Sequence, residues 1–283
     1  MKSLKTPLRY PGGKSRAVKY LIPKMPKDIT EYREPFLGGG SVAIAFTKEY
    51  PDIPVWVNDL YEPLANFWQQ LQANGESLKD ELLKLKEKHP DPTTANVLFL
   101  EAKEYLNEDK RKTDPFHRAV SFWVINKCSF SGLTESSSFS KQASDHNFTV
   151  RGIENLPYYS EIIKDWKITC GPYWDMMMTP APVNTFWFLD PPYDIKDNLY
   201  GKKGELHKGF NHEEFHGWMT QGNVKDRWMI TYNTNPTLMD WYKDYYQTKW
   251  DLTYTMRSVG DYMNEQKDRA ELLITSYDST QPE

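Results

Sequence analysis

The sequence has little cysteine and no long apolar run, and these shortages exclude several classes of protein. Cys128 and Cys170 are the two cysteines among 283 residues, so there is no disulfide framework and no zinc-finger spacing. The six histidines also lack metal-ligand spacing, and we expect no metal site. No apolar window is long enough to span a membrane, and MKSLKTPLRYPGGK at the start is not a signal peptide. We expect a cytoplasmic protein, bacterial or in the host of a phage, with no membrane partner.

An excess of positive charge is lacking as well. The net charge is −4, which argues weakly against nucleic-acid binding because phosphate contacts need Lys and Arg. The charge is unevenly spread, however: residues 1–33 carry nine Lys or Arg against two acids, and KKGELHK at 202–208 is a second basic cluster. Since local patches matter more than the sum for binding a polyanion, DNA remains a candidate partner.

Apolar periodicity divides the chain into three blocks. Residues 1–60 read as a βαβ unit in which a strand runs into a glycine turn, a helix follows, and a second strand ends at Asp59. Residues 61–125 have helical spacing, and the polar stretch 128–152 reads as a long loop. In the last block we expect five strands: Lys167–Cys170, Thr185–Leu189, Trp228–Tyr232, Leu252–Met256 and Glu271–Tyr277. These elements predict an α/β sheet with a helical insertion.

The stretch EPFLGGGSV at 34–42 has the features of a cofactor turn. Its glycines let the backbone approach a ligand, and the helix that follows offers unpaired N–H groups. Asp59 comes about twenty residues later at a strand end, where acids bind ribose hydroxyls in nucleotide sites. The spacing is not GxGxxG, so a dinucleotide is not favoured. The combination favours an adenosine-containing cofactor over a plain tight turn.

Two further stretches supply candidate chemistry. In LRYPGGKSR, Lys14 could hold a carboxylate or phosphate and Tyr10 could contact a flat or cationic group, although a solvated surface turn is the simpler alternative. In TFWFLDPPYD, a buried strand ends at Asp190, and ligands bind beyond the carboxyl ends of such strands. The Asp190 carboxylate and a neighbouring carbonyl could accept both hydrogens of an amino group, while Tyr193 could stack on a planar base.

These motifs occur in the order seen in the Dam family of S-adenosylmethionine-dependent DNA adenine methyltransferases, and the chain resembles a phage or orphan member of it. The resemblance rests on YPGGK, EPFLGGGSV, ND, INKCSFSGL and DPPY, followed by FNHEEF, ITYN and AELLITSY. It covers nearly the whole chain. It implies a Rossmann-like class I methyltransferase domain formed by residues 1–60 and 153–283. Residues 61–152 would be an inserted helical target-recognition domain, with a DNA-reading hairpin near 126–151.

The resemblance also implies roles for individual residues. S-adenosylmethionine would bind to Tyr10, Lys14, Phe36, Gly38, Gly39, Gly40, Asp59, Tyr173 and Asp190, with Lys14 on the methionine carboxylate and Asp59 on the ribose. Asp190, Pro191, Pro192 and Tyr193 would form the catalytic motif around a flipped-out adenine of double-stranded DNA. From their charge and position we also expect DNA contacts at Lys127, Phe130, Ser131, Leu133, Glu135, Lys141, Arg151, Lys202 and Lys203. Phe130 is a candidate wedge into the duplex, with simple loop packing as an equal alternative.

Two departures from the family pattern matter. Pro172 stands where many members carry an acid that contacts the cofactor adenine, which leaves Tyr173 to pack on that ring. Glu135 stands where the family has an arginine that reads guanine. A glutamate cannot donate to guanine O6 and N7, although it can accept from cytosine N4. We therefore expect a target other than GATC.

Three alternatives are compatible with the sequence. The acceptor could be cytosine N4 or an RNA adenine, or the protein could be a non-catalytic DNA-binding protein that keeps the fold. DPPY favours adenine, because cytosine enzymes resemble this motif with serine in place of Asp190. Intact Lys14, Gly38–Gly40, Asp190 and Tyr193 argue against a non-catalytic protein. No feature indicates an obligate protein partner.

Overall fold

The fold is built on one mixed sheet. The computed structural model describes residues 6–132, 137–193, 209–222, 224, 226–250 and 271–280. The strands are β1 (Glu31–Glu34), β2 (Val55–Asp59), β3 (Lys167–Cys170), β4 (Thr185–Leu189), β5 (Arg227–Asn233), β6 (Tyr246–Trp250) and β7 (Glu271–Thr275). Their order is β3-β2-β1-β4-β5-β7-β6. The first five run parallel, and β7 lies antiparallel between β5 and β6. The predicted α/β class is confirmed.

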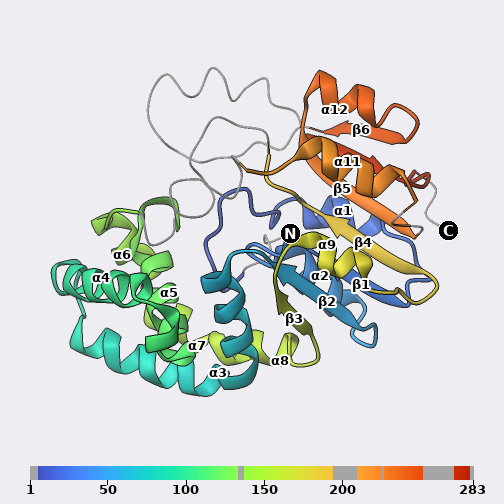
Figure 1. Cartoon of the computed structure of the whole chain (residues 1–283). Coiled ribbons are helices and arrows are strands. Elements are labelled where there is room, and N and C mark those ends of the chain that lie inside the picture. Colours follow the sequence, from blue (N-terminus) through green and yellow to red (C-terminus); the bar gives the residue numbers. More distant parts are fainter. Residues whose placement is uncertain are drawn as a thin grey trace.

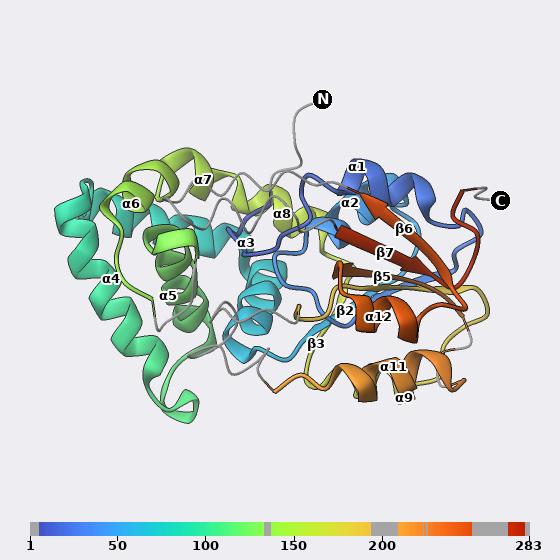
Figure 2. The same ribbon diagram turned by 90° about the horizontal axis from the view of Figure 1, so that it is seen from above.

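Helices cover both faces of this sheet, which is why its central strands read as continuous apolar runs. In β4, Phe186 and Phe188 enter one core while Trp187 and Leu189 enter a second core on the opposite face. Figure 2 shows α1 and α2 on one side of the sheet and α9, α11 and α12 on the other. Their bounds are α1 Val18–Leu21, continued by a 3₁₀ turn at Ile22–Lys24, α2 Ser41–Glu49, α9 Tyr173–Met178, α11 His212–Thr220 and α12 Pro236–Trp241.

The remaining helices gather beside the sheet (Figure 1). They are α3 (Glu62–Lys88), α4 (Pro92–Asn107), α5 (Pro115–Cys128), α6 (Lys141–Asn147), α7 (Val150–Glu154) and α8 (Leu156–Ile162), with 3₁₀ turns at Lys110–Lys112 and Phe130–Gly132. α5 packs against α3, α4 and α6, while α7 and α8 pack against α3. α3 contacts strands β2 and β3 and bends at Asn74, where the backbone leaves helical geometry. α3 therefore joins the helical part to the sheet.

The polar stretch 128–152 is not one long loop, as the sequence suggested. An antiparallel bridge between Ser129 and Phe139 closes a hairpin, and two short helices, α6 and α7, follow it. Ser140 and Thr149 accept hydrogen bonds from backbone N–H groups at the starts of these helices. The same Ser and Thr residues that made the stretch look like a loop are helix caps.

The strand predictions of the last block are mostly confirmed. β3 and β4 have the predicted bounds, β5 is one residue longer at each end, and β7 stops at Thr275. The predicted strand Leu252–Met256 lies outside the described residues. β6 was missed because YQTKW has few apolar residues, which suits a partly exposed strand at the sheet edge.

Candidate active site

A cavity opens where the strand order of the sheet reverses, between β1 and β4. In open α/β sheets this switch point is where ligands bind. The cavity has a volume of about 260 Å³. Most of the predicted cofactor residues line it: Tyr10, Lys14, Phe36, Gly38, Gly39, Asp59, Tyr173 and Asp190. The structure therefore brings together residues that are up to 180 positions apart in the chain.

Asp59 ends β2 with its carboxylate turned towards the glycine turn. One oxygen accepts a hydrogen bond from the Gly38 N–H at 2.9 Å, and the other accepts from the Tyr61 N–H, also at 2.9 Å. The side chain is 9% exposed. Burial raises the pKa of Asp59 to about 6, and these backbone donors offset only part of that effect. A ligand that donates hydroxyl groups would therefore be attracted to this carboxylate.

The three glycines of the turn have different reasons to be glycine. Gly38 has a φ of +50°, and a Cβ on it would lie 2.8 Å from the Tyr10 ring. A Cβ on Gly39 would lie 2.8 Å from the Tyr10 Cβ. Gly40 has a φ of +66°, and its Cβ would lie 2.7 Å from the ring of Trp68. Gly40 thus packs against the core and is not among the residues that line the cavity, unlike the other two.

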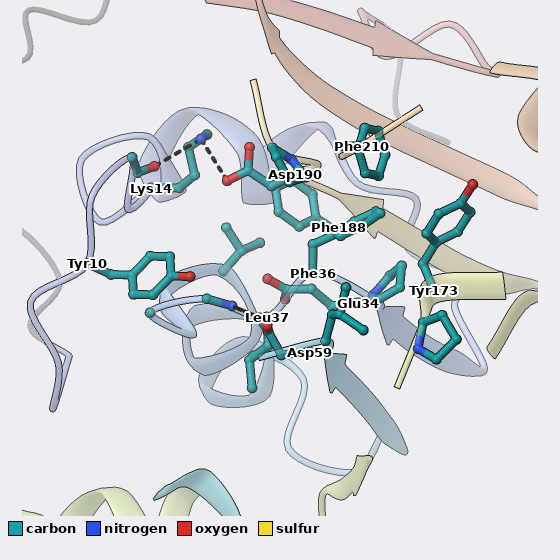
Figure 3. Close-up of a pocket in the computed structure, with 18 of the residues that line it drawn as sticks. Tyr10, Lys14, Glu34, Phe36, Leu37, Asp59, Tyr173, Phe188, Asp190 and Phe210 are labelled. Atoms are coloured by element: carbon teal, nitrogen blue, oxygen red, sulfur yellow. Dashed lines mark hydrogen bonds and ion pairs between the residues drawn. The ribbon is translucent and has the colours of Figure 1, made fainter. Parts of the chain in front are cut away.

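Lys14 and Asp190 form an ion pair at one end of the cavity. The Lys14 Nζ lies 2.7 Å from the Asp190 Oδ2 and donates also to the Gly12 carbonyl at 3.0 Å. The other carboxylate oxygen, Oδ1, accepts from the Thr231 hydroxyl at 2.7 Å. Lys14 is buried, at 3% exposure. Figure 3 shows the ion pair beside Tyr10 and across the cavity from Tyr173. The sequence prediction missed Thr231, which belongs to another strand.

The rest of the DPPY motif follows Asp190 along the chain. Pro191 is buried, and Pro192 lines the cavity. The Tyr193 hydroxyl lies 2.6 Å from the Glu271 Oε2, and the Lys14 Nζ is 4.8 Å from the centroid of the Tyr193 ring. The motif is thus attached to β5 through Asp190 and to β7 through Tyr193.

Aromatic rings form the other end of the cavity. The ring centroid of Phe36 lies 5.5 Å from that of Tyr173 and 5.7 Å from that of Phe210, and these last two are 5.8 Å apart. Figure 3 shows Tyr173 and Phe210 opposite Tyr10 and Lys14. The cavity therefore has an aromatic end suited to a flat ring and a charged end suited to polar groups.

Glu34 is a second buried acid that the sequence prediction did not assign. It ends β1, lines the cavity and is 2% exposed. The Tyr32 hydroxyl lies 2.6 Å from its Oε2. Burial raises the pKa of Glu34 well above its ordinary value, and the nearby Asp190 and Asp59 raise it further. An acid at the last position of a strand, like Asp59 in β2, was the signal that could have identified it.

The residues predicted to contact DNA differ in how exposed their side chains are. Phe130 is 56% exposed, and Lys141 and Arg151 are exposed on α6 and α7. Ser131 lies in the 3₁₀ turn beside Phe130. Leu133, Glu135, Lys202 and Lys203 lie outside the described residues. Lys127 is instead buried in α5 at 8% exposure, with its Nζ 5.2 Å from the Trp123 ring centroid.

The environment of Lys127 differs from that of a phosphate contact. Burial, aided by the charge of Arg9, lowers the pKa of Lys127 to about 7. An ammonium that is withdrawn from water in this way cannot reach a phosphate without leaving the core. We therefore do not retain Lys127 among the proposed DNA contacts.

Asn126 joins the start of the chain to the hairpin. Its side-chain oxygen accepts from the Arg9 N–H at 2.9 Å, and its amide nitrogen donates to the carbonyls of Arg9 and Gly132 at 2.6 and 3.1 Å. Arg9 precedes Tyr10 of the cavity, and Gly132 follows Phe130 in the hairpin. One buried asparagine thus connects the candidate cofactor and DNA-reading segments.

The described part of the chain contains neither a metal-binding cluster nor a membrane-spanning helix. No group of three or more His, Cys, Asp or Glu side chains there could hold a metal ion. No helix within those same residues combines the length and apolar character needed to cross a membrane.

The chain is similar in sequence to one family model and to several known proteins. Residues 10–256 match the family model described as D12 class N6 adenine-specific DNA methyltransferase. The chain is 25% identical over 197 residues to Type II methyltransferase M.MjaIII of Methanocaldococcus jannaschii, covering 66% of this chain and 68% of that one. It is 23% identical over 281 residues to Type II methyltransferase M1.LlaDCHI of Lactococcus lactis subsp. cremoris, covering 95% and 94%. It is also 24% identical over 209 residues to the DNA N-6-adenine-methyltransferase of Escherichia phage P1, covering 73% and 26%.

Proposed function

Because the chain belongs to the D12 class of N6 adenine-specific DNA methyltransferases, we propose that the cavity between β1 and β4 binds S-adenosylmethionine and that Asp190–Tyr193 receives a flipped-out adenine. The carrying observation is the meeting of Lys14, Asp59, Asp190 and an aromatic cluster around one cavity. Because this family is specific for adenine N6 in DNA, it favours that acceptor over cytosine N4 and over adenine in RNA.

The residues of the cavity fit S-adenosylmethionine in chemistry. Asp59 accepts hydrogen bonds, as ribose hydroxyls require, and its raised pKa reflects a carboxylate that lacks water. Tyr173 and its aromatic neighbours provide faces for the adenine ring, although Pro172 beside them supplies no acid. Lys14 has three ammonium hydrogens, and the contacts to Gly12 and Asp190 use two of them. The third would hold the methionine carboxylate.

In the proposed mechanism the protein positions the amino group. S-adenosylmethionine, when bound, supplies a methyl group on a sulfonium centre. The Asp190 carboxylate and the Pro191 carbonyl accept the two amino hydrogens of the adenine, which directs the nitrogen lone pair towards the cofactor side. Each carboxylate oxygen has capacity for a further hydrogen bond beyond those from Lys14 and Thr231. Tyr193 stacks on the base, which the enzyme extrudes because its amino group is inaccessible within the duplex.

We propose the hairpin closed by Ser129 and Phe139 as the element that reads DNA. Phe130 is a large exposed ring within it, as a wedge would be, and Lys141 and Arg151 supply exposed positive charge on α6 and α7. The basic residues Lys202 and Lys203 are proposed on sequence alone. The same holds for Glu135, on which we base the proposal that this Dam-like member recognises a sequence other than GATC. Methylome sequencing of a Dam-deficient host that expresses the protein tests this, since methylation confined to GATC would contradict it.

The proposed function is tested by transfer of tritium from labelled S-adenosylmethionine to unmethylated duplex DNA. Wild-type protein should label DNA, and Asp190→Asn should not, because an amide in place of the carboxylate disrupts the acceptor pair and the ion pair with Lys14. The unfolding temperature and circular dichroism spectrum of Asp190→Asn provide the control for folding. Cofactor binding by the wild type without transfer to any of several DNAs would instead favour a non-catalytic DNA-binding protein.

A further inference from the structure

We propose that Thr231 and Glu271 are positioning residues that fix the carboxylate and the ring of the DPPY motif from two neighbouring strands. This inference rests on the proposed function of that motif. Neither residue lies near Asp190 or Tyr193 in sequence, and neither is among the residues that line the cavity. Each makes a short hydrogen bond to the side chain that it would position.

Thr231 determines how the Asp190 carboxylate is turned. It is fully buried in β5, and the pairing of Leu189 with Ile230 places the two residues at adjacent strand positions. Its hydroxyl donates to Oδ1 at 2.7 Å, while Lys14 donates to Oδ2 at 2.7 Å. The terminal torsion of an aspartate is otherwise broad. Rotation of this carboxylate would therefore break at least one of two hydrogen bonds.

Glu271 holds the other end of the motif. It begins β7, is 4% exposed, and its Oε2 lies 2.6 Å from the Tyr193 hydroxyl. β7 pairs with β5 so that Asn233 faces Glu271 and Thr231 faces Leu273. Because side chains alternate along a strand, this register puts Thr231 and Glu271 on the same face of the sheet. Two neighbouring strands thus present one donor and one acceptor to a single loop.

Lys14 lies close to both of the side chains that Thr231 and Glu271 hold. Its Nζ lies 2.7 Å from the Asp190 carboxylate and 4.8 Å from the centre of the Tyr193 ring. The lysine therefore sits between the group proposed to bind the amino hydrogens and the ring proposed to stack on the base. Thr231 and Glu271 anchor this arrangement from outside, so that carboxylate and ring keep a fixed relation. Misplacement of a reacting group by about 1 Å can slow a reaction by about 100-fold.

Thr231 is tested by a matched pair of variants. Thr231→Val keeps the shape of the side chain and removes the hydroxyl, whereas Thr231→Ser keeps the hydroxyl. In single-turnover methyl transfer with saturating DNA and cofactor, Thr231→Val should be slower by about 10- to 100-fold and Thr231→Ser within about threefold of wild type. Cofactor affinity and the unfolding temperature should change little in both. Equal rates for the two variants would overturn the role of the hydroxyl.

Glu271 is tested by a double-mutant cycle with Tyr193→Phe. Glu271→Leu should slow single-turnover transfer by about 10-fold in the wild-type background and by a clearly smaller factor in the Tyr193→Phe background, because the hydrogen bond between Tyr193 and Glu271 is already absent there. Glu271→Gln, which keeps an acceptor, should restore most of the rate. Multiplicative effects in the double variant would overturn the inference for Glu271. No transfer by the wild type would refute the proposed function itself, whereas transfer with unchanged rates in all variants would overturn only this inference.

Discussion

Replacement of Asp59 by asparagine should change how stability depends on pH. The pKa of Asp59 is raised by burial from 3.8 to about 6. The folded protein therefore binds a proton in a range of pH where the unfolded chain has released it. The unfolding free energy must fall as pH rises through this window, and the full penalty is present above pH 6. The asparagine of the variant cannot ionise, so the variant is free of this dependence.

The size of the effect follows from the pKa. A difference of one pKa unit corresponds to about 1.4 kcal/mol, so a rise from 3.8 to about 6 destabilises the folded protein by about 3 kcal/mol at high pH. Part of this destabilisation is already present at pH 4.5. The unfolding free energy of Asp59→Asn relative to wild type should therefore increase by about 2 kcal/mol between about pH 4.5 and about pH 8. Loss of one backbone hydrogen bond to Gly38 or Tyr61 shifts the variant at all pH values alike and cancels in this comparison.

Urea denaturation at several pH values, without cofactor, measures this quantity. Asp91→Asn is a suitable control of opposite sign. Asp91 caps α4 and accepts from the N–H groups of Thr93 and Thr94, which lower its pKa. The unfolding free energy of the wild type should therefore increase relative to that of Asp91→Asn as pH rises. A difference between Asp59→Asn and wild type that stays constant with pH, or changes in the direction of the Asp91 control, would refute the account of Asp59 as a desolvated carboxylate.

Three further predictions concern the same site. Gly38→Ala should lose stability and cofactor binding, because the φ of +50° and the 2.8 Å distance from the new Cβ to the Tyr10 ring both oppose a side chain. Gly222→Ala is the control, since Gly222 also has a positive φ but open space around it. Calorimetry compares the stability and the cofactor binding of the two variants. Tyr173→Ala should weaken cofactor binding by about 10-fold through loss of ring packing, while replacement of the exposed Tyr158 by alanine should not. Asn126→Asp should lower the unfolding free energy by about 1–3 kcal/mol and weaken DNA binding in a filter assay, because the carbonyls of Arg9 and Gly132 lose their donor. Unchanged DNA affinity would show that the hairpin does not need the hydrogen bonds of Asn126.

Much of the candidate site could be predicted because its residues are local to strand ends. Asp59 and Asp190 each follow a buried apolar run, and parallel strands bring their carboxyl ends to one edge of a sheet. The glycine turn was also readable, but the reason for its glycines was not. The sequence suggested close approach of a ligand, whereas Gly38 and Gly39 also make room for Tyr10, and Gly40 makes room for Trp68.

Contacts made through tertiary pairing could not be read from the sequence. Thr231 and Glu271 reach the DPPY motif because β5 lies beside β4 and β7 beside β5, and strand order has no local signature. The burial of Lys127 could not be predicted for a similar reason. Its basic side chain next to a conspicuous motif suggested DNA, but α5 is surrounded by α3, α4 and α6 and is buried along most of its length.

We propose that this protein methylates the N6 atom of adenine in DNA at a site built around Asp190. The most direct test of this proposal is mass spectrometry of nucleosides from unmethylated duplex DNA after incubation with the protein and S-adenosylmethionine. We predict N6-methyldeoxyadenosine with wild-type protein and none with Asp190→Asn. N4-methyldeoxycytidine in place of that product, or equal yields of N6-methyldeoxyadenosine from both proteins, would contradict the account.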